Sequence, residues 1–385
     1  MSALELQGPM TRTIIVSATL ESLSIDDATT SSQSYELQLA RAFAEIQSTT
    51  VISLVAVDDA RLDGLKLVGL RSEPRGFTSA WSLTRELLRE KRRGTQVISF
   101  GYDPLMVLPL VLARALGANA YTIVFDTHVG SSERFAPVKR TLVNAYFGLG
   151  ILLLRALSGL FVVTREAEER FSRLNGRTLR TRIGFDVERA KPWGRPLSEE
   201  FSVIYAGALE VYNGIQQMMD GVILRNRDDS STRPVVLHLY GTGNLRSMVE
   251  VYAARHEGIV YHGVGVKSQV EAAVLRSNLA FNLRDLDHPV SVNAFPSKLI
   301  ELLGSGVPVA TTAVLPSALL SRFALVVAEV SAESVMEALR RAENNYAIFA
   351  EKAASAPSFI ECEYDWQVIV SDMSGFMGGV STTVV

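Results

Sequence analysis

The sequence predicts an α/β protein with two domains, each built around a parallel β-sheet. The chain has 385 residues, which is enough for two domains that each bury a core of their own. Short segments rich in Val and Ile alternate with amphipathic helical patterns along the chain. Strands separated by helices are typical of βαβ units, in which the strands run parallel.

The first run of alternating segments extends from residue 12 to Asp126. Helices are expected where apolar residues recur every three to four positions, and strands where Val, Ile and aromatic residues form short runs. In chain order we expect a strand at 12–18, a helix at 34–46, a strand at 49–57, a helix at 81–94, a strand at 95–101, a helix at 104–117 and a strand at 120–126. These segments predict a Rossmann-like domain at 1–186.

A second run begins at residue 201 and repeats the alternation. We expect a strand at 201–207, a helix at 214–225, a strand at 234–241, a helix at 244–255 and a strand at 259–263. This run predicts a second Rossmann-like domain at 201–358. The segment 187–200 is polar and contains two prolines, as an interdomain linker does. Two such domains would face a cleft, with a ligand outside the carboxyl ends of the strands.

Composition excludes several classes of protein. The net charge of −3 offers no basic field for nucleic acid. Cys362 is the only cysteine, so a disulfide framework is impossible and a reducing cytoplasm is expected. The start of the chain, MSALELQGPM, lacks the basic and apolar parts of a signal peptide.

The most apolar stretch, at 141–164, is interrupted by Arg155, and its uncharged part is shorter than the roughly 20 residues of a spanning helix. Two interpretations of the segment 138–160 remain. With Lys139 and Arg140 it suits an amphipathic helix in weak contact with the inner face of a membrane. It equally suits a core helix packed on the sheet, and we prefer that interpretation.

Residues 280–312 form the most informative segment. A short apolar strand ends in Arg284, a polar loop follows, and Pro296 opens a helix. Pro at the first helical position costs no hydrogen bond. Gly304 and Gly306 are expected to end the helix, and a further strand follows at 307–311.

The helix that begins at Pro296 combines groups that suit a nucleotide. Its first turns carry Ser297, Lys298 and Glu301. A helix start presents free N–H groups and the positive end of the dipole to a phosphate, and Lys298 adds a formal charge. Glu301 is placed about one turn along, where it can accept hydrogen bonds from ribose hydroxyls.

The segment resembles the donor-site signature of GT-B glycosyltransferases of the large retaining group (glycosyl transferases group 1, family 4-like). That signature runs through an apolar strand, a loop, Phe295-Pro296, a short helix with Glu301, and Gly306-Val307-Pro308-Val309. The resemblance covers almost the whole chain, including a closing segment at 359–385 that would return to the first domain.

The resemblance implies a GT-B glycosyltransferase that moves a sugar from a nucleotide-diphosphate sugar to an acceptor hydroxyl. The acceptor would be a carbohydrate, a lipid-linked or a small molecule, as in polysaccharide or glycoconjugate biosynthesis. Retention of the anomeric configuration is implied as well. No Asp-x-Asp motif is positioned for a diphosphate, so we expect no metal and no cofactor beyond the nucleotide sugar, which is a co-substrate.

The main departure from the family concerns positive charge at the diphosphate. Common members carry Arg after the glycine that corresponds to Gly207, and Lys before the glycine that corresponds to Gly214. This chain has Ala208 and Asn213 at those places. We still expect Gly207, Asn213 and Gly214 at the donor site.

Arg284 and Lys298 are expected to replace the lost cations. Burying a diphosphate without cations is costly. Related transferases with the same loss carry Leu-Arg at the end of a later strand and Pro-x-Lys at the helix, as in Leu283-Arg284 and Pro296-Ser297-Lys298 here. The alternative is that both are solvated surface cations.

Other donor contacts are expected from loops after the strands. Gly241 and Gly243 would bring the backbone close to the donor, and Gly263 belongs to the same rim. Asn293 occupies a place where many relatives have a second glutamate that touches the sugar. Asn can bind a hydroxyl but adds no negative charge, and it is also common in turns.

Two catalytic candidates follow the strand that ends near Asp126. In the family, a His at the place of His128 lies near the donor sugar, and Asp126 could orient it. Each could instead be a turn residue.

Two alternatives to a transferase stay open. One is a nucleotide-sugar epimerase on the same fold, which needs several acid–base groups at the sugar. The other is a non-catalytic relative that binds a nucleotide or a partner.

Overall fold

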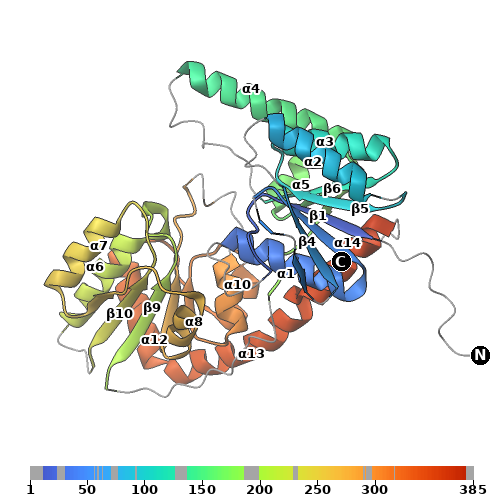
Figure 1. Ribbon diagram of the computed structural model, residues 1–385. Helices are drawn as coiled ribbons and strands as arrows, with labels where there is room; N and C mark the ends of the chain where they lie inside the picture. The colour runs from blue at the N-terminus through green and yellow to red at the C-terminus, as the bar shows by residue number, and fades with distance from the viewer. Residues whose placement is uncertain are drawn as a thin grey trace, which may run out of the picture. The chain divides into compact units, whose positions relative to one another are not determined.

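A computed structural model describes residues 12–23, 31–55, 57–58, 60–62, 64–70, 77–91, 93–125, 137–185, 199–228, 233–288, 291, 297–315 and 317–378. The chain forms two compact units (Figure 1). The first contains residues 1–184, 293–295 and 366–385, and the second contains residues 185–292 and 296–365. The linker expected at 187–200 falls almost wholly outside the described residues.

The first unit is built on one sheet whose central strands are parallel. Among the described residues its strands are β1 (Thr13–Ser17), β2 (Thr49–Ser53), β3 (Ala60–Leu62), β4 (Leu65–Gly69), β5 (Gln96–Phe100), β6 (Asn119–Val124), β7 (Gly159–Val162) and β8 (Thr178–Arg180). They lie in the order β3-β4-β2-β1-β5-β6-β7-β8. Strands β2 to β4 are added on one side of β1, and β5 to β8 are added on the other side. The carboxyl ends of the parallel neighbours β1 and β5 therefore mark the switch point of this sheet.

Helices cover both faces of this sheet because alternate side chains of each strand point to opposite sides. On one face Ile15 and Ile98 pack with α1 (Ser31–Ile46) and α14 (Trp366–Gly378). On the other face Ile14 and Val97 pack with helices that Figure 1 shows side by side. These are α2 (Phe77–Glu90), α3 (Pro104–Ala115) and α4 (Pro137–Leu153), followed by η1 (Leu154–Ala156) and α5 (Arg165–Phe171).

The strand–helix alternation is interrupted once in this unit. Strands β3 and β4 form an antiparallel hairpin at the edge of the sheet, with Leu62 opposite Leu65. Only parallel strands joined by helices were expected from the sequence, so this hairpin was not predicted. The hairpin leaves the other neighbours parallel, so the switch point is unaffected.

The expectation that 138–160 forms a buried core helix is wrong. Gly150 is the only buried residue of α4. Apolar side chains of this helix are largely exposed, Val138 to 76% and Leu142 to 66%. Among the described residues, the contacts of α4 with the core come from Phe147, Ile151 and Leu153 in its second half. No helix in the described part of the chain is long and apolar enough to cross a membrane.

The second unit contains a fully parallel sheet. Within the described residues its strands are β9 (Phe201–Ala206), β10 (Val235–Tyr240), β11 (Ile259–Tyr261), β12 (Leu279–Asn282), β13 (Val309–Thr311) and β14 (Leu325–Val326). They lie in the order β11-β10-β9-β12-β13-β14. Numbered from the first strand of the unit this order is 3-2-1-4-5-6, that of the Rossmann fold.

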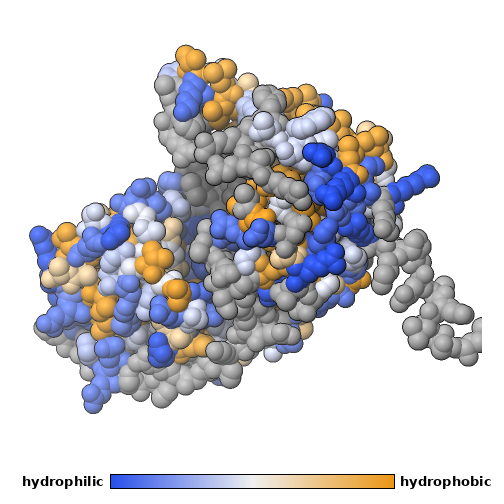
Figure 2. Space-filling view, in the orientation of Figure 1, coloured by the Kyte–Doolittle hydropathy of each residue, from blue (hydrophilic) through white to orange (hydrophobic). Residues whose placement is uncertain are grey.

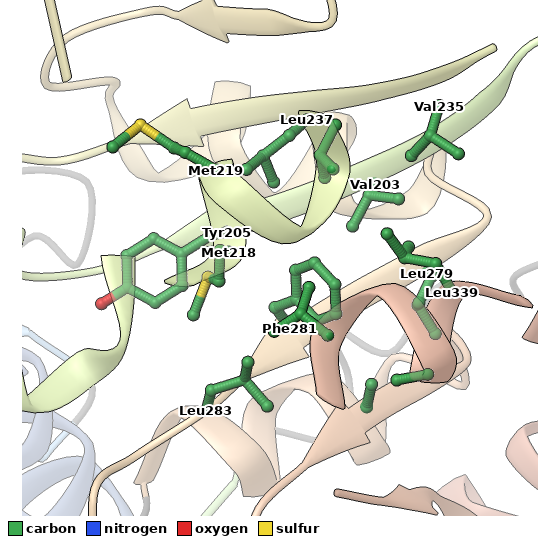
Figure 3. Packing of buried hydrophobic residues seen from close by; sticks show 14 of the residues in the cluster. Val203, Tyr205, Met218, Met219, Val235, Leu237, Leu279, Phe281, Leu283 and Leu339 are labelled. Atoms are coloured by element: carbon green, nitrogen blue, oxygen red, sulfur yellow. The ribbon is translucent and has the colours of Figure 1, made fainter. Parts of the chain in front are cut away.

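The helices of the second unit are α6 (Ile215–Asn226), α7 (Arg246–Arg255), α8 (Lys267–Leu275), α10 (Ser297–Gly304), α11 (Ser317–Phe323), α12 (Ala332–Asn344) and α13 (Tyr346–Tyr364), with the short η3 (Val211–Asn213) before α6. An apolar core joins the sheet to α6, α7, α12 and the first residue of α13. Leu237 and Phe281 of the sheet meet Met218, Met219 and Leu339 from the helices, as Figure 3 shows.

The end of the chain leaves the second unit after Asp365 and joins the first. There α14 packs beside α1, and Trp366 donates a hydrogen bond from Nε1 to Oε1 of Gln38 at 2.7 Å. The Trp366 ring also meets Tyr35 edge-on. A closing helix that returns to the first domain was expected from the sequence, and α14 is that helix.

Candidate functional site

The candidate site lies at the carboxyl ends of β9 and β12 in the second unit. These strands are neighbours in the sheet, although β10 and β11 come between them in the chain. The loops that follow them therefore diverge, and the crevice at such a switch point is where open α/β sheets bind ligands. Gly207 follows β9, and Arg284 lies two residues beyond the end of β12.

The loop after β9 is held in shape by its own side chains. Ala208 O accepts hydrogen bonds from the Tyr205 hydroxyl and from Asn213 Nδ2, both at 2.8 Å. Gly214 then precedes α6. Asn213 is 7% exposed, so its amide works within the loop and its position next to the switch point is fixed. The Asn213 side chain therefore holds the loop after β9 in shape.

Glycines let three neighbouring loops approach each other closely. Gly207 N donates to Tyr240 O at 3.0 Å, and Gly241 N donates to Gly263 O at 2.8 Å. A Cβ on Gly241 would lie 1.9 Å from the carbonyl oxygen of Gly207, so no larger residue fits. Gly243 lies on the same rim, beside Leu209, whose N–H bonds to Thr242 O at 2.9 Å. Of the glycines expected at the donor site, Gly207, Gly241, Gly243 and Gly263 are therefore brought together.

The backbone of Arg284 is held by two hydrogen bonds, whereas one nitrogen of its side chain has no acceptor among the described residues. Its N–H donates to Thr312 Oγ1 at 3.0 Å, and its carbonyl accepts from the same hydroxyl at 2.9 Å. The residue is half-buried, and its buried Nη1 has no hydrogen-bond partner among the described residues. A buried cationic donor without an acceptor is unusual in a folded protein, because the lost hydrogen bond costs free energy.

The charge of Arg284 acts on the loop after β9. The pKa values of the Tyr205 and Tyr212 hydroxyls are raised, chiefly by burial. The nearby guanidinium of Arg284 opposes this rise at both hydroxyls. The two loops also touch, since Asp285 N donates to Tyr212 O at 2.8 Å. The positive charge therefore lies at the switch point, next to the loop after β9.

The two other predicted groups, Lys298 and Glu301, lie in the first turns of α10. Lys298 Nζ and Glu301 Oε2 are 2.9 Å apart, and the side chains are 48% and 47% exposed. Ser297 is the first residue of the helix. An exposed pair of this kind contributes about 0.2–1 kcal/mol. A ligand with stronger partners for both groups would separate them at little cost.

Five predicted residues fall outside the described part of the chain. Asp126 and His128 follow β6, whose last residue is Val124. The others are Asn293, Phe295 and Pro296, which precede α10. Their roles stay predictions.

Two residues that shape the site were not predicted from the sequence, because their partners lie far from them in the chain. Glu210 accepts hydrogen bonds from the backbone N–H and the Nδ2 of Asn244, at 3.1 and 2.8 Å, and so ties the loop after β9 to the loop after β10. Thr312, which anchors Arg284, follows β13. No local pattern identifies either residue, because each contact depends on strand order.

A comparison of the sequence finds no matching protein-family model and no matching curated protein. The structure, in contrast, is similar to solved structures over nearly the whole chain. Sucrose-phosphate synthase from Thermosynechococcus elongatus has 13% identity and a TM-score of 0.70, over 96% of this chain and 99% of that chain. HepE of Anabaena in complex with UDP has 11% identity and a TM-score of 0.65, over 96% and 100%.

A third similar structure is WaaG, a glycosyltransferase involved in lipopolysaccharide biosynthesis, with 13% identity and a TM-score of 0.65, over 96% of this chain and 100% of that chain. At such low identities the likeness establishes the fold. Each of the three structures spans both units of this chain and has the GT-B architecture. The chain therefore has the GT-B fold, as the sequence predicted.

Proposed function

We propose that the protein is a glycosyltransferase that moves a sugar from a nucleotide-diphosphate sugar to an acceptor hydroxyl. The second unit would bind the donor at the switch point between β9 and β12. The carrying observation is Arg284, whose buried Nη1 has no hydrogen-bond partner in the described part of the chain and whose charge lies beside the loop after β9. A diphosphate oxygen supplies the acceptor that this group lacks, in a charge-assisted hydrogen bond.

The other groups at this end of the sheet have complementary roles in the proposal. The close-packed glycine loops at Gly207, Gly241 and Gly263 leave backbone exposed to the donor. Lys298 and the N-terminus of α10 would bind the diphosphate. Glu301 would leave its ion pair with Lys298 and accept hydrogen bonds from the ribose. HepE was solved with UDP and with UDP-glucose, which supports a donor of this class.

Catalysis would depend mainly on charge and position. Arg284 and Lys298 would stabilise the negative charge that develops on the departing diphosphate. The first unit would hold the acceptor, with His128 near the sugar and Asp126 orienting it. We propose retention of the anomeric configuration, no metal, and a carbohydrate or lipid-linked acceptor reached from the cytoplasm at the inner face of a membrane.

The alternatives differ in what they require. An epimerase needs acid–base groups around the sugar, but three of the described carboxylates near this rim already have partners. Glu210 and Glu301 are each bound to a neighbouring side chain. Asp285 accepts a hydrogen bond from the backbone N–H of Asp287 at 3.1 Å. A non-catalytic nucleotide-binding protein is favoured by one observation, the presence of Ala208 and Asn213 where the family carries cations. Binding and turnover therefore have to be measured separately.

A thermal-shift panel tests the donor site. UDP, ADP, GDP and their sugar conjugates are compared with the bare nucleosides. A ligand at about 100 times its dissociation constant adds about 2.7 kcal/mol of stability, which shifts the melting temperature visibly. We expect stabilisation by one nucleoside diphosphate and its sugar conjugates, and little by the nucleoside. No stabilisation by any diphosphate at millimolar concentration would refute the proposed donor site.

A further inference from the structure

The most exposed apolar surface of the first unit lies on α4. Val138, Leu142, Tyr146, Leu149 and Leu152 are all exposed and follow one another at spacings of three or four residues. Residues at these spacings share one side of a helix. They therefore form a continuous apolar stripe from the first turn of the helix to its last.

This stripe is presented on a firm support. A Cβ on Gly150 would lie 1.8 Å from the carbonyl oxygen of Tyr102, so the helix rests directly on the backbone before α3. The Tyr146 hydroxyl donates to Oδ1 of Asp103 at 2.6 Å, and Phe147 meets Tyr102 edge-on. These contacts hold the last turns of α4, while Figure 1 shows its other end extending past α3.

The neighbouring helices carry similar stripes. On α3, Leu108 and Leu112 are exposed one turn apart, and Leu116 caps the same helix. On α2, Trp81 is 74% exposed, and Leu88 lies two turns further on the same side. Helices α2, α3 and α4 are successive neighbours. Figure 2 shows hydrophobic side chains gathered over α4 and α3. We call these residues of the three helices the three-helix surface.

The charges of these helices have one predominant sign. The basic residues are Arg85, Arg89, Arg114, Lys139 and Arg140, and all five are exposed. Helices α3 and α4 contain no acidic residue. On α2, Glu90 is bound to Arg12 and Lys66, and Glu86 lies near Arg89. The three-helix surface is therefore basic, although the whole chain has a net charge of −3.

We propose that the three-helix surface docks on an anionic lipid bilayer, with the apolar stripe of α4 and Trp81 in the interface and the basic residues against the lipid headgroups. A large apolar face beside Lys and Arg suits a bilayer, which offers hydrocarbon and negative charge together. Trp at the edge of such a face prefers the headgroup region. The charge asymmetry favours this partner over a second copy of the chain, because two such surfaces would repel each other.

Vesicle flotation with the full chain tests the proposal. Vesicles of phosphatidylcholine alone are compared with vesicles that also contain phosphatidylglycerol. The protein floats with the anionic vesicles at low salt and at least about tenfold less with the neutral ones. The double variant Leu142→Ser/Leu149→Ser loses at least about tenfold in partitioning, equivalent to about 1.4 kcal/mol. Lys139→Ser/Arg140→Ser removes most of the preference for anionic lipid.

Matched controls separate lipid contact from other effects. Val251→Ser/Ile348→Ser removes two exposed apolar side chains from the second unit and leaves flotation unchanged. Brominated lipid quenches tryptophan fluorescence in the wild type, and Trp81→Phe abolishes most of the quenching but not the flotation. Melting curves verify that each variant is folded.

Three results would overturn the proposal. One is the absence of flotation at any salt concentration, and another is an equal loss in the control variant. The third is a dimer, seen by light scattering, that dissociates in Leu142→Ser/Leu149→Ser and does not float. That result would assign the three-helix surface to a second copy of the chain.

Discussion

Arg284→Ala is the substitution that most sharply separates a phosphate site from a structural arginine. The backbone of Arg284 is held on both sides by the Thr312 hydroxyl, and neither hydrogen bond involves the Arg284 side chain. Within the described residues its Nη1 has no hydrogen-bond partner, so the substitution breaks no hydrogen bond of that atom there. We therefore expect the fold to tolerate the change.

The expected loss of affinity follows from the interaction removed. A hydrogen bond to a charged group contributes about 1.5–3 kcal/mol. At 1.4 kcal/mol for each tenfold change, the dissociation constant for the nucleoside diphosphate that the thermal-shift panel identifies, written here as UDP, rises by roughly 10- to 150-fold. Affinity for uridine hardly changes, because uridine has no phosphate to bind Arg284.

Isothermal titration calorimetry with UDP and uridine provides the assay. Arg255→Ala serves as the matched control, because Arg255 is exposed in the last turn of α7, at the opposite end of the unit's helices from the site. Lys298→Ala lowers affinity for UDP by a similar amount. The two losses are not additive in the double variant, because both cations bind one diphosphate.

Two results would contradict this reasoning. Equal losses for UDP and uridine in Arg284→Ala would mean that the substitution damages the fold. No loss for either ligand would return Arg284 and Lys298 to the status of surface cations and would favour a non-catalytic protein.

Three further predictions concern other residues. Glu301→Ala weakens binding of the nucleoside diphosphate by about 1.5–3 kcal/mol. A 2′,3′-dideoxy nucleotide binds wild type and variant alike, because it lacks the ribose hydroxyls. A variant that still binds the ribose nucleotide more tightly than the dideoxy one would disprove the ribose contact. His128→Ala leaves nucleotide binding nearly intact and slows transfer at least about 100-fold, and near-normal turnover would remove His128 from the site. Burial raises the pKa of Glu36, which accepts a hydrogen bond from Ser17. A raised pKa favours the protonated folded state, so stability is lost as pH rises through that pKa. Glu36→Gln should therefore gain stability over wild type in urea unfolding at pH 8 but not at pH 4, and a pH-independent difference would contradict this assignment.

The strand–helix alternation could be predicted because it depends on local periodicity. The helix at the donor-site segment is a clear example. Gly306 has a φ of +71°, and its N–H bonds to Leu303 O at 3.1 Å, so α10 ends at Gly304 as the glycines predicted. A positive φ is easy for glycine and rare for other residues, which makes such an ending visible in one sequence.

Two features of the fold were missed for different reasons. The hairpin of β3 and β4 has a local signal, Asp63-Gly64 between short apolar runs, and this pair is common in tight hairpin turns. The exposure of α4 has a weaker local signal in the sequence. Its apolar residues occupy almost every side of the helix and so resemble a core helix. Only the nearby Lys139 and Arg140 indicated an exposed surface.

Some site residues could likewise be predicted from the sequence, and others could not. The loop glycines could be found from their positions after predicted strands. Two contacts could not be predicted: the hydrogen bond that Asn213 Nδ2 donates to Ala208 O, and the one that Thr312 Oγ1 accepts from Arg284 N. Both depend on which strands lie side by side, and β12 lies beside β9 only in the folded sheet.

The most direct test of the central claim measures whether the full chain releases a nucleoside diphosphate from nucleotide-diphosphate sugars. A coupled enzymatic assay monitors this release, first without acceptor and then with candidate acceptors. We expect measurable release from at least one donor by wild type and by Arg255→Ala. Release should be at least about tenfold slower with Arg284→Ala, which loses an interaction with the leaving diphosphate. Tight binding of a nucleoside diphosphate without release from any of its sugar conjugates would contradict this expectation and would make the protein a nucleotide-binding relative of the transferases.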